Sequence, residues 1–443
     1  MTAQPWFGVR TVPPEIGLAP ERIFEVVTEE LRGLPRIGFP YALQPMVVPQ
    51  ASYRELLVAT AELLSLLRRT VVGLAGDRAG RIAALGIDPA DCPLFTPDED
   101  FELRHCADMT RADVIIGPGG PKFVEFNVGG AFGGMPPFHQ SQKAWARIRA
   151  EAGRPAFVAA DTYSRQARLI EATSAELGVP PSAVVVGTPR DWGPDVGTRM
   201  FDVQIDALRG HGVPATHLDF DDLLDGIGLP GAVDRPLGLA AFTPQDAAEI
   251  GYSLEPARVA QEAGLVLIPS QSAWFLHSKK TLALLSEGQP WMTRRETELV
   301  QQYVPWSRVV GDRKVLWHGR RHDLPRLLAE HQESFVLKGA TGWSCQEVYF
   351  GWTTSPQRWA ELVDEAVRTG YYIAQERVPA ETYPLDLMTE TGEITRIRAE
   401  SVVSPFCLGG DPAGCFVRFA EADNQALAIG GLGVGVSCLL AEA

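Results

Sequence analysis

The spacing of apolar residues predicts alternating helices and strands along most of the chain. Over 51–74 apolar side chains recur every three or four residues, as they do on the buried face of a long amphipathic helix. They are Leu56, Leu57, Leu63, Leu64, Leu67 and Val71. A second helix is expected over 161–177, followed after Val-Pro-Pro by a short apolar strand over 183–187.

The middle third continues the same alternation. The strand at 183–187 is followed by a helix over 197–208 and by strands over 214–219 and 265–268. Helices that alternate with short strands are typical of a parallel sheet covered by helices. Because no G-x-G-x-x-G sequence follows a predicted strand, we expect residues 151–277 to form a Rossmann-like substrate domain without a dinucleotide site.

The last third mixes helices and strands less regularly. Helices are predicted over 293–303 and 356–369, and strands over 334–338, 347–351 and 372–378. This mixture suits an α+β unit that binds a nucleotide. We therefore predict three parts: a helical region with a polar hairpin over 1–150, the Rossmann-like domain over 151–277, and the α+β unit over 278–443.

The polar hairpin is the segment Arg-Ala-Asp-Val-Ile-Ile-Gly-Pro-Gly-Gly-Pro-Lys-Phe-Val-Glu-Phe-Asn, residues 111–127. Proline and glycine at its centre supply the turn. A turn centred on Gly119 places Asp113 opposite Glu125 and Arg111 opposite Asn127, because side chains alternate between the faces of a strand pair. The other face is then apolar, with Val114, Ile116, Val124 and Phe126.

The polar face of this hairpin carries the chemistry of a metal site. Carboxylate and amide oxygens suit Mg²⁺, which keeps several waters and is usually shared between carboxylates and nucleotide phosphates. A guanidinium beside them could hold a carboxylate or a developing oxyanion. The alternative interpretation is an ordinary hairpin whose polar face is solvated, and the residue pattern alone does not decide between the two.

Arg-x-Asp, a turn and Glu-x-Asn at this spacing resemble the metal-binding hairpin of glutathionylspermidine synthase and its circularly permuted ATP-grasp relatives. The resemblance implies that Asp113, Glu125 and Asn127 hold Mg²⁺. It implies in addition that Arg111 binds and polarises the reacting carboxylate. Gly129 to Gly134, directly after the hairpin, lets the backbone approach a ligand closely, and an ordinary surface loop is the alternative.

Two lysine segments resemble the same family and follow in its order along the chain. His-Ser-Lys-Lys-Thr-Leu, from His277, is similar to the Ser-Asn-Lys segment that opens the ATP-grasp unit, which implies that Lys280 binds phosphate. Lys279 stands where relatives have Asn, so the choice between the two lysines stays open. Lys338 resembles the second ATP lysine, and the loop after it, 339–346, contains fewer glycines than in relatives. A lone lysine is more often an exposed end of a helix or strand.

The resemblance extends to two further segments. Tyr-Ile-Ala-Gln-Glu-Arg-Val, residues 372–378, is similar to the strand and hinge that line the adenine pocket. This implies that Gln375, Glu376 and Val378 contact the adenine, although the same segment could be a plain buried strand. Arg418 resembles an arginine that contacts the transferred phosphoryl group, and a surface ion pair is the alternative. Because the hairpin precedes the lysines in sequence, the resemblance implies a circularly permuted ATP-grasp fold.

Composition narrows the partners. A formal net charge of -15 argues against nucleic acid and anionic membranes as main partners, because both require clustered Lys and Arg. The six cysteines include no C-x-x-C pair, so neither a zinc site nor a disulfide framework is indicated. No signal-like segment or apolar run of about 20 residues is present, and we expect a cytoplasmic protein.

These observations predict an ATP- and Mg²⁺-dependent ligase that activates a small-molecule carboxylate as an acyl phosphate and joins it to an amine. The alternatives are a phosphotransferase or an ester-forming ligase on the same fold, because the motifs do not identify the nucleophile. A degenerate nucleotide-binding scaffold protein is the alternative from another class. The identities of the acid and the amine, a carrier-bound substrate and a homo-oligomeric state all stay open.

Overall fold

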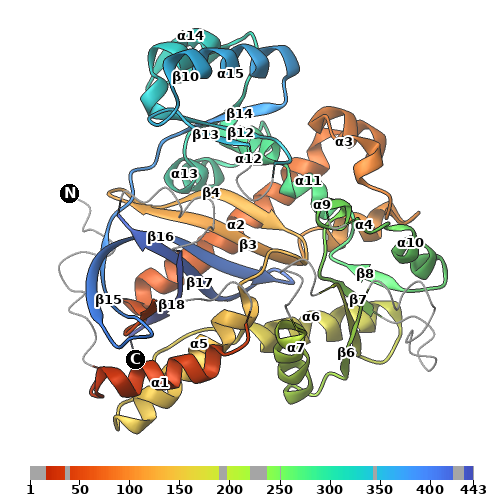
Figure 1. Ribbon diagram of the computed structural model, residues 1–443. Coiled ribbons are helices and arrows are strands. Elements are labelled where there is room, and N and C mark those ends of the chain that lie inside the picture. Colours follow the sequence, from red (N-terminus) through yellow and green to blue (C-terminus); the bar gives the residue numbers. More distant parts are fainter. Residues whose placement is uncertain are drawn as a thin grey trace.

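The computed structural model describes residues 16–34, 40–188, 197–219, 237–249, 251–342, 347–422 and 434–442. Within these ranges the strands form one eight-stranded sheet, two four-stranded sheets and one two-stranded hairpin. Figure 1 shows the large sheet in the centre, a small unit of helices and strands above it, and a short sheet with its helices beside it.

The central sheet combines early and late parts of the chain. Its strands run in the order β1 (Tyr41–Ala42), β15 (Tyr383–Met388), β16 (Ile394–Leu408), β17 (Asp411–Glu421), β18 (Gly435–Ala441) and β2 (Met46–Val48). The hairpin strands β3 (Met109–Gly117) and β4 (Gly120–Val128) join through pairing of β3 with β16. This pairing places the hairpin beside strands that lie about 300 residues later in the sequence.

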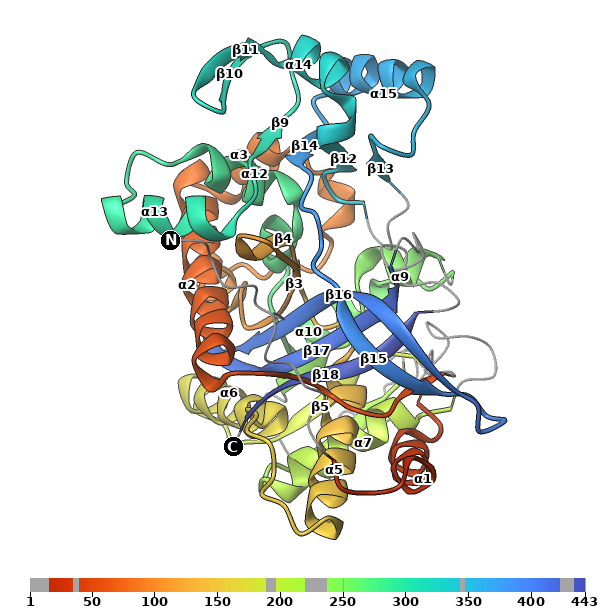
Figure 2. The same cartoon turned by 90° about the vertical axis from the view of Figure 1, so that its left-hand side faces the viewer.

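Helices cover both faces of the central sheet (Figures 1 and 2). The long helix α2 (Gln50–Leu74) packs Leu56, Leu63 and Leu67 against the apolar side of the hairpin and of β16 and β17. The opposite face packs against α1 (Pro20–Leu31), α5 (Met135–Glu151) and α6 (Thr162–Leu177). Burial of these apolar faces gives the hairpin a rigid support.

A second, parallel sheet has the strand order β6 (Ala215–Leu218), β5 (Ala183–Val186), β7 (Leu237–Ala240) and β8 (Val266–Ile268). Its helices are α7 (Arg199–Gly210), α9 (Pro244–Glu249) and α10 (Glu255–Glu262). The predicted small parallel sheet is therefore confirmed. The strand β7 was not predicted, because Leu-Gly-Leu-Ala contains a glycine and lacks a β-branched residue.

The small antiparallel sheet has the order β13 (Val348–Phe350), β12 (Phe335–Gly339), β14 (Tyr372–Glu376) and β9 (Ser307–Val309). Together with the hairpin β10 (Lys314–Trp317) and β11 (Arg320–Asp323) and the helices α14 (Leu324–Glu330) and α15 (Pro356–Thr369), it builds its own core around Trp359, Phe335 and Leu337. The helices α11 (Ala273–His277), α12 (Lys279–Glu287) and α13 (Arg294–Tyr303) pack on α2 and β4.

The predicted helices and strands are found with their ends within about two residues of those expected. The helix predicted over 356–369 has the same bounds in the structure, whereas the strand predicted over 372–378 ends at Glu376. Two further helices, α3 (Arg78–Leu85) and α4 (Glu99–His105), lie between α2 and the hairpin in sequence.

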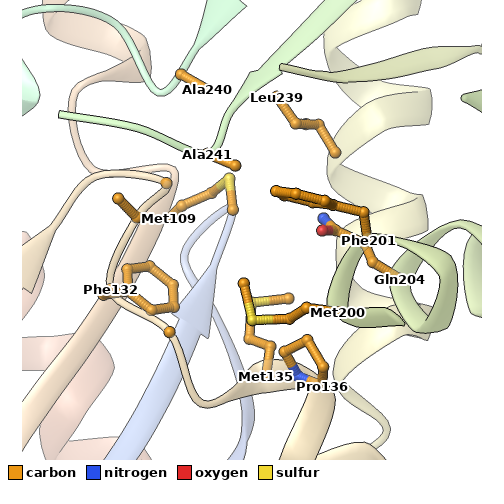
Figure 3. Close-up of a pocket in the computed structure, with 13 residues that line it drawn as sticks. Met109, Phe132, Met135, Pro136, Met200, Phe201, Gln204, Leu239, Ala240 and Ala241 are labelled. Carbon is orange, nitrogen blue, oxygen red and sulfur yellow. The ribbon is translucent and has the colours of Figure 1, made fainter. Parts of the chain in front are cut away.

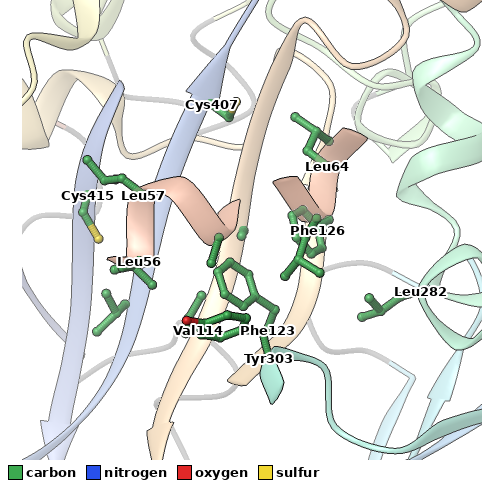
Figure 4. Packing of buried hydrophobic residues seen from close by; sticks show 14 of the residues in the cluster. Leu56, Leu57, Leu64, Val114, Phe123, Phe126, Leu282, Tyr303, Cys407 and Cys415 are labelled. Carbon is green, nitrogen blue, oxygen red and sulfur yellow. The ribbon is translucent and has the colours of Figure 1, made fainter. Parts of the chain in front are cut away.

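The cross-strand pairs of the hairpin match the prediction, but one apolar position does not. Asp113 pairs with Glu125 and Arg111 with Asn127, and beyond them the register shifts so that Val114 pairs with Phe123. The shift makes Val124 an extra residue, and Phe123 takes its expected place in the core (Figure 4). The prediction that Val124 faces the core was therefore wrong, because a β-bulge reverses the alternation of side chains.

Five cysteines of the described residues are buried free thiols, in agreement with the absence of a disulfide framework. Within the same residues no helix combines the length and the apolar character that a membrane span requires.

A buried histidine should make stability depend on pH. His105 Nδ1 lies 2.6 Å from Asp108 Oδ2 and Nε2 lies 3.2 Å from Glu176 Oε2. Burial alone would lower the pKa of His105, but the two carboxylates raise it above its ordinary 6.5. The stabilisation is therefore complete below the unfolded-state pKa and is lost as pH rises through the folded-state pKa.

We expect the free energy of unfolding to fall as pH rises above about 6.5 and through the raised folded-state pKa of His105. The His105→Gln variant should be less stable by about 1 to 3 kcal/mol at the acidic end and should lack this part of the slope. Urea unfolding of the wild type and the variant, at pH values below and above 6.5, measures the free energy of unfolding of each. Parallel curves for the two proteins would contradict the assignment.

Candidate active site

The polar face of the β3–β4 hairpin gathers two carboxylates that are each held by cations from other segments. Asp113 and Glu125 are direct cross-strand neighbours, and their side chains are 13% and 20% exposed. Side chains opposite each other in a strand pair lie close enough to share a ligand. The structure thus places two of the predicted metal ligands side by side.

Asp113 lies between two guanidinium groups. Its Oδ2 accepts a hydrogen bond of 2.8 Å from Arg418 Nη2, and its Oδ1 lies 3.3 Å from Arg111 Nε. Ser404 Oγ donates to Oδ1 at 2.9 Å. Burial alone would raise the pKa of Asp113, but Arg111, Arg418 and these hydrogen bonds hold it below its ordinary value.

Arg111 links the hairpin to the glycine-rich loop that follows it. Its Nη1 donates a hydrogen bond to the carbonyl oxygen of Phe132, and burial lowers the pKa of its guanidinium. Asn127, opposite Arg111, donates through Nδ2 to the Arg111 carbonyl oxygen at 3.3 Å. All four predicted polar residues of the hairpin therefore lie together on one face.

Glu125 is neutralised by lysines from two other segments. Lys279 Nζ, at the start of α12, lies 3.1 Å from Glu125 Oε1 and also donates to the Gly342 carbonyl. Burial alone would raise the pKa of Glu125, but Lys279 and Lys338 lower it below its ordinary value. His277 lies nearby, and burial together with Lys279 lowers its pKa to about 4, so its imidazole is neutral at pH 7.

The β-bulge at Val124 connects the hairpin with the small antiparallel sheet. The Val124 carbonyl accepts hydrogen bonds from Lys338 Nζ at 3.0 Å and from Gln375 Nε2 at 3.2 Å. A bulged residue leaves the regular ladder, so its carbonyl is available to side chains. Gln375 is buried and donates in addition to Ser307 Oγ at 3.1 Å. Lys338 and Gln375 thus approach the bulge next to Glu125 from neighbouring strands.

The structure does not bring Lys280 to this group. Its Nζ donates to the Leu85 carbonyl at the end of α3, at 2.8 Å, and burial lowers its pKa. Lys279 occupies the position beside Glu125 instead. Consecutive residues of a helix point about 100° apart, so only one of two adjacent lysines can face the hairpin.

The predicted hinge lies against the turn of the hairpin. Glu376 uses its backbone N–H to pair with the Trp306 carbonyl at 2.8 Å, and its carboxylate lies 2.8 Å from His318 Nε2. Val378 packs beside Gly117, where an added Cβ would come within 3.3 Å of it. The Glu376 N–H is therefore already used within the sheet, whereas Gln375 and Val378 lie beside the hairpin.

Arg418 joins the site although it is 305 residues from Asp113. It lies on β17, and the pairing of β17 with β16 and of β16 with β3 brings it to the polar face. Ser404 was not predicted as a site residue, because no sequence motif surrounds this serine within β16. Of the predicted loop 339–346, residues 343–346 lie outside the described part.

The side chains of this face suit a metal ion that also binds a ligand, rather than one that is coordinated by the protein alone. Among the described residues no three His, Cys, Asp or Glu side chains are grouped for a metal ion. However, two adjacent carboxylates and a carboxamide can serve as the protein ligands of Mg²⁺ when phosphates and water complete its coordination. The chemistry of these side chains fits Mg²⁺ only together with such a ligand.

Neither a protein-family model nor a curated protein sequence matches the chain. Among solved structures, a glutathione synthetase-like effector from Globodera pallida, in its apo form, matches with a TM-score of 0.56 and 13% identity over 96% of this chain and 98% of that chain. A candidate gamma-glutamylcysteine synthetase from Methylobacillus flagellatus KT aligns with a TM-score of 0.41 and 11% identity over 91% of this chain and 90% of that chain. The first match shows that the chain has a glutathione synthetase-like fold.

Proposed function

We propose that this protein is an ATP- and Mg²⁺-dependent carbon–nitrogen ligase with a circularly permuted ATP-grasp architecture. It activates a small-molecule carboxylate as an acyl phosphate and transfers the acyl group to an amine. The observation that carries the proposal is the adjacent pair Asp113 and Glu125, each ion-paired with cations of other segments on one largely buried face. The glutathione synthetase-like fold supports it, because a synthetase joins two substrates, as the proposed ligase does.

The charges of the site favour a reaction between two anions. Arg111, Arg418, Lys279 and Lys338 supply four positive charges around two carboxylates. Positive groups held in a partly buried site act more strongly on phosphate and carboxylate than they would in water. A carboxylate that attacks ATP needs this compensation, because like charges otherwise repel.

The arginine side of the site suits the reacting carboxylate and the transferred phosphoryl group. Arg111 and Arg418 both contact Asp113, so an incoming anion would find two guanidinium groups already oriented. Preorganised donors lower the barrier because they need no rearrangement during the reaction. In the proposal Arg111 binds the carboxylate and Arg418 stabilises the phosphoryl group.

The lysine side suits the nucleotide phosphates. Lys279 and Lys338 lie beside Glu125, and Gln375 shares the Val124 carbonyl with Lys338. We assign Lys279 rather than Lys280 to phosphate binding, and we place the adenine near Gln375 and Val378. Mg²⁺ bound to Asp113, Glu125 and Asn127 would neutralise and polarise the phosphates.

A hydroxylamine assay tests the proposal. The purified protein receives ATP, Mg²⁺, a panel of carboxylic and amino acids, and hydroxylamine in place of the amine. An acyl phosphate intermediate should give a hydroxamate together with ADP in equal amounts. Release of AMP, or ADP formation without any acid, would contradict the ligase mechanism, and absence of Mg²⁺-dependent nucleotide binding would favour a scaffold protein.

Replacing Glu125 by Gln should raise the Mg²⁺ concentration needed for half-maximal ADP release by about 10-fold or more, because a charged metal ligand is lost while the shape is kept. A Mg²⁺ titration at fixed ATP measures the shift. Glu421→Gln, at the exposed end of β17, is the matched control and should titrate as the wild type does. If the Mg²⁺ titrations of Glu125→Gln and Glu421→Gln were equal, Glu125 would not be a metal ligand.

A further inference from the structure

A pocket of apolar residues lies between the central and the parallel sheets (Figure 3), and Phe132 in its lining accepts a hydrogen bond from Arg111. One wall is the loop after β4, with Ala131 and Phe132, and the opposite wall is the first part of α7. The large apolar side chains that line it are those of Met109, Phe132, Met135, Met200, Phe201 and Leu239. The space between these walls, counted together with the open solvent at its mouth, is about 480 Å³.

The pocket adjoins the site of the proposed reaction. The Phe132 carbonyl accepts a hydrogen bond from Arg111 Nη1, so one residue belongs both to the pocket wall and to the anchor of the guanidinium. Gly130 brings this loop against β7, where an added Cβ would lie 1.5 Å from the Ala240 carbonyl oxygen. A carboxylate held by Arg111 would therefore have its substituent within reach of the pocket.

The position in the parallel sheet also favours a ligand. From β5 the chain continues to β6 on one side and later to β7 on the other, so the order of the strands reverses between β5 and β7. Leu239 to Ala241, which line the pocket, lie at the carboxyl end of β7. In open α/β sheets, ligands bind outside the carboxyl ends of the strands where the order reverses. The pocket opens at this place.

The lining excludes charged groups. Among the described residues that form the pocket none has an ionisable side chain, and Gln204 is the side chain that can form hydrogen bonds. Gln204 is held by a hydrogen bond of 3.1 Å from its Nε2 to Gln166 Oε1. A charged substituent would lose its hydration there without gaining a partner, which costs free energy. Transfer of an apolar substituent from water into the pocket is favourable in free energy.

We propose that this pocket binds the uncharged, apolar substituent of the carboxylic acid, so that the substrate is an acid with an aliphatic, thioether or aromatic group rather than a dicarboxylic acid. The inference rests on the proposed function, because it assumes that Arg111 holds the reacting carboxylate. The pocket then selects the acid, and the arginine side of the site activates it.

The test compares acetate, butyrate, hexanoate and glutarate in the hydroxylamine assay. Specificity, as kcat/KM, should rise by about 4- to 10-fold for each methylene until the pocket is filled, and glutarate should react more slowly than hexanoate. Binding of hexanoate in the absence of nucleotide, measured by saturation-transfer NMR, gives a readout that does not depend on turnover.

Met200→Lys places a charge in the pocket wall and should reduce kcat/KM for hexanoate by about 10-fold or more, with the KM for ATP unchanged. Gly210→Lys adds the same charge at the end of the same helix, where an added Cβ meets nothing within 4 Å, and should behave as the wild type. Preference for glutarate, or equal activity of both variants, would overturn the inference and leave the ligase function intact. Hexanoate binding that is lost only in Met200→Lys, without turnover of any acid, would uphold the pocket and overturn the function.

Discussion

The Arg111→Met variant should lose most of its carboxylate activation while it still binds ATP. Arg111 lies 3.3 Å from Asp113 and is fixed to the Phe132 carbonyl, so its guanidinium is oriented before any substrate arrives. Loss of one preorganised donor of this kind costs about 100- to 1000-fold in kcat. Hydroxamate formation with a saturating acid measures the loss, and ATP titration in the same variant measures binding.

Two comparisons separate the role of Arg111 from a general effect of charge. Arg294→Met removes an arginine that is 93% exposed and should react as the wild type does. Arg111→Lys keeps the positive charge but loses the planar fork that matches a carboxylate, so it should recover only a small part of the rate. Wild-type hydroxamate formation by Arg111→Met would show that the carboxylate binds elsewhere.

The hairpin could be predicted because its signals are local. Alternating residues and a Pro-Gly turn determine which side chains share a face, and Asp113 does pair with Glu125. The bulge at Val124 could not be predicted, because it depends on distant partners. Lys338 and Gln375, more than 200 residues away, hold its carbonyl, while Phe123 fills the core beneath α2.

No local pattern predicts the parts of the site that come from distant strands, and Arg418 was identified through resemblance alone. Arg418 reaches Asp113 because β17, β16 and β3 are neighbours in the central sheet, and no local pattern predicts this order. Ser404 reaches the same carboxylate from β16 and has no sequence signal at all. The small parallel sheet could be predicted from its helix–strand alternation, but β7 lacks the β-branched residues that mark a strand.

Which of Lys279 and Lys280 faces the site depends on how the first turn of α12 is rotated about the helix axis. Both lysines belong to the same motif, and both are buried. The Lys279 N–H pairs with the Ala340 carbonyl, and this contact orients the first turn of α12 so that Lys279 faces Glu125 and Lys280 faces Leu85. The sequence pattern contains no information on this rotation, because it is set by packing against β12 and its loop.

Replacing Lys279 by Met should therefore raise the ATP concentration needed for half-maximal activity by about 10- to 150-fold, since charge-assisted contacts to phosphate contribute about 1.5 to 3 kcal/mol. The adjacent Lys280→Met variant should change this concentration less than about twofold, because its ammonium contacts the end of α3. ATP titrations of both variants at saturating acid measure the difference.

The two variants make the same substitution at neighbouring buried positions, so their difference reports which of the two lysines faces the site. Lys280→Met exchanges a buried ammonium for an apolar chain of similar length, and its effect should appear in thermal unfolding rather than in ATP binding. The reverse result, with ATP binding lost in Lys280→Met and kept in Lys279→Met, would mean that nucleotide binding rotates the start of α12 by about one residue, or about 100°. Unchanged ATP titrations in both variants would place the nucleotide away from the face that carries Glu125.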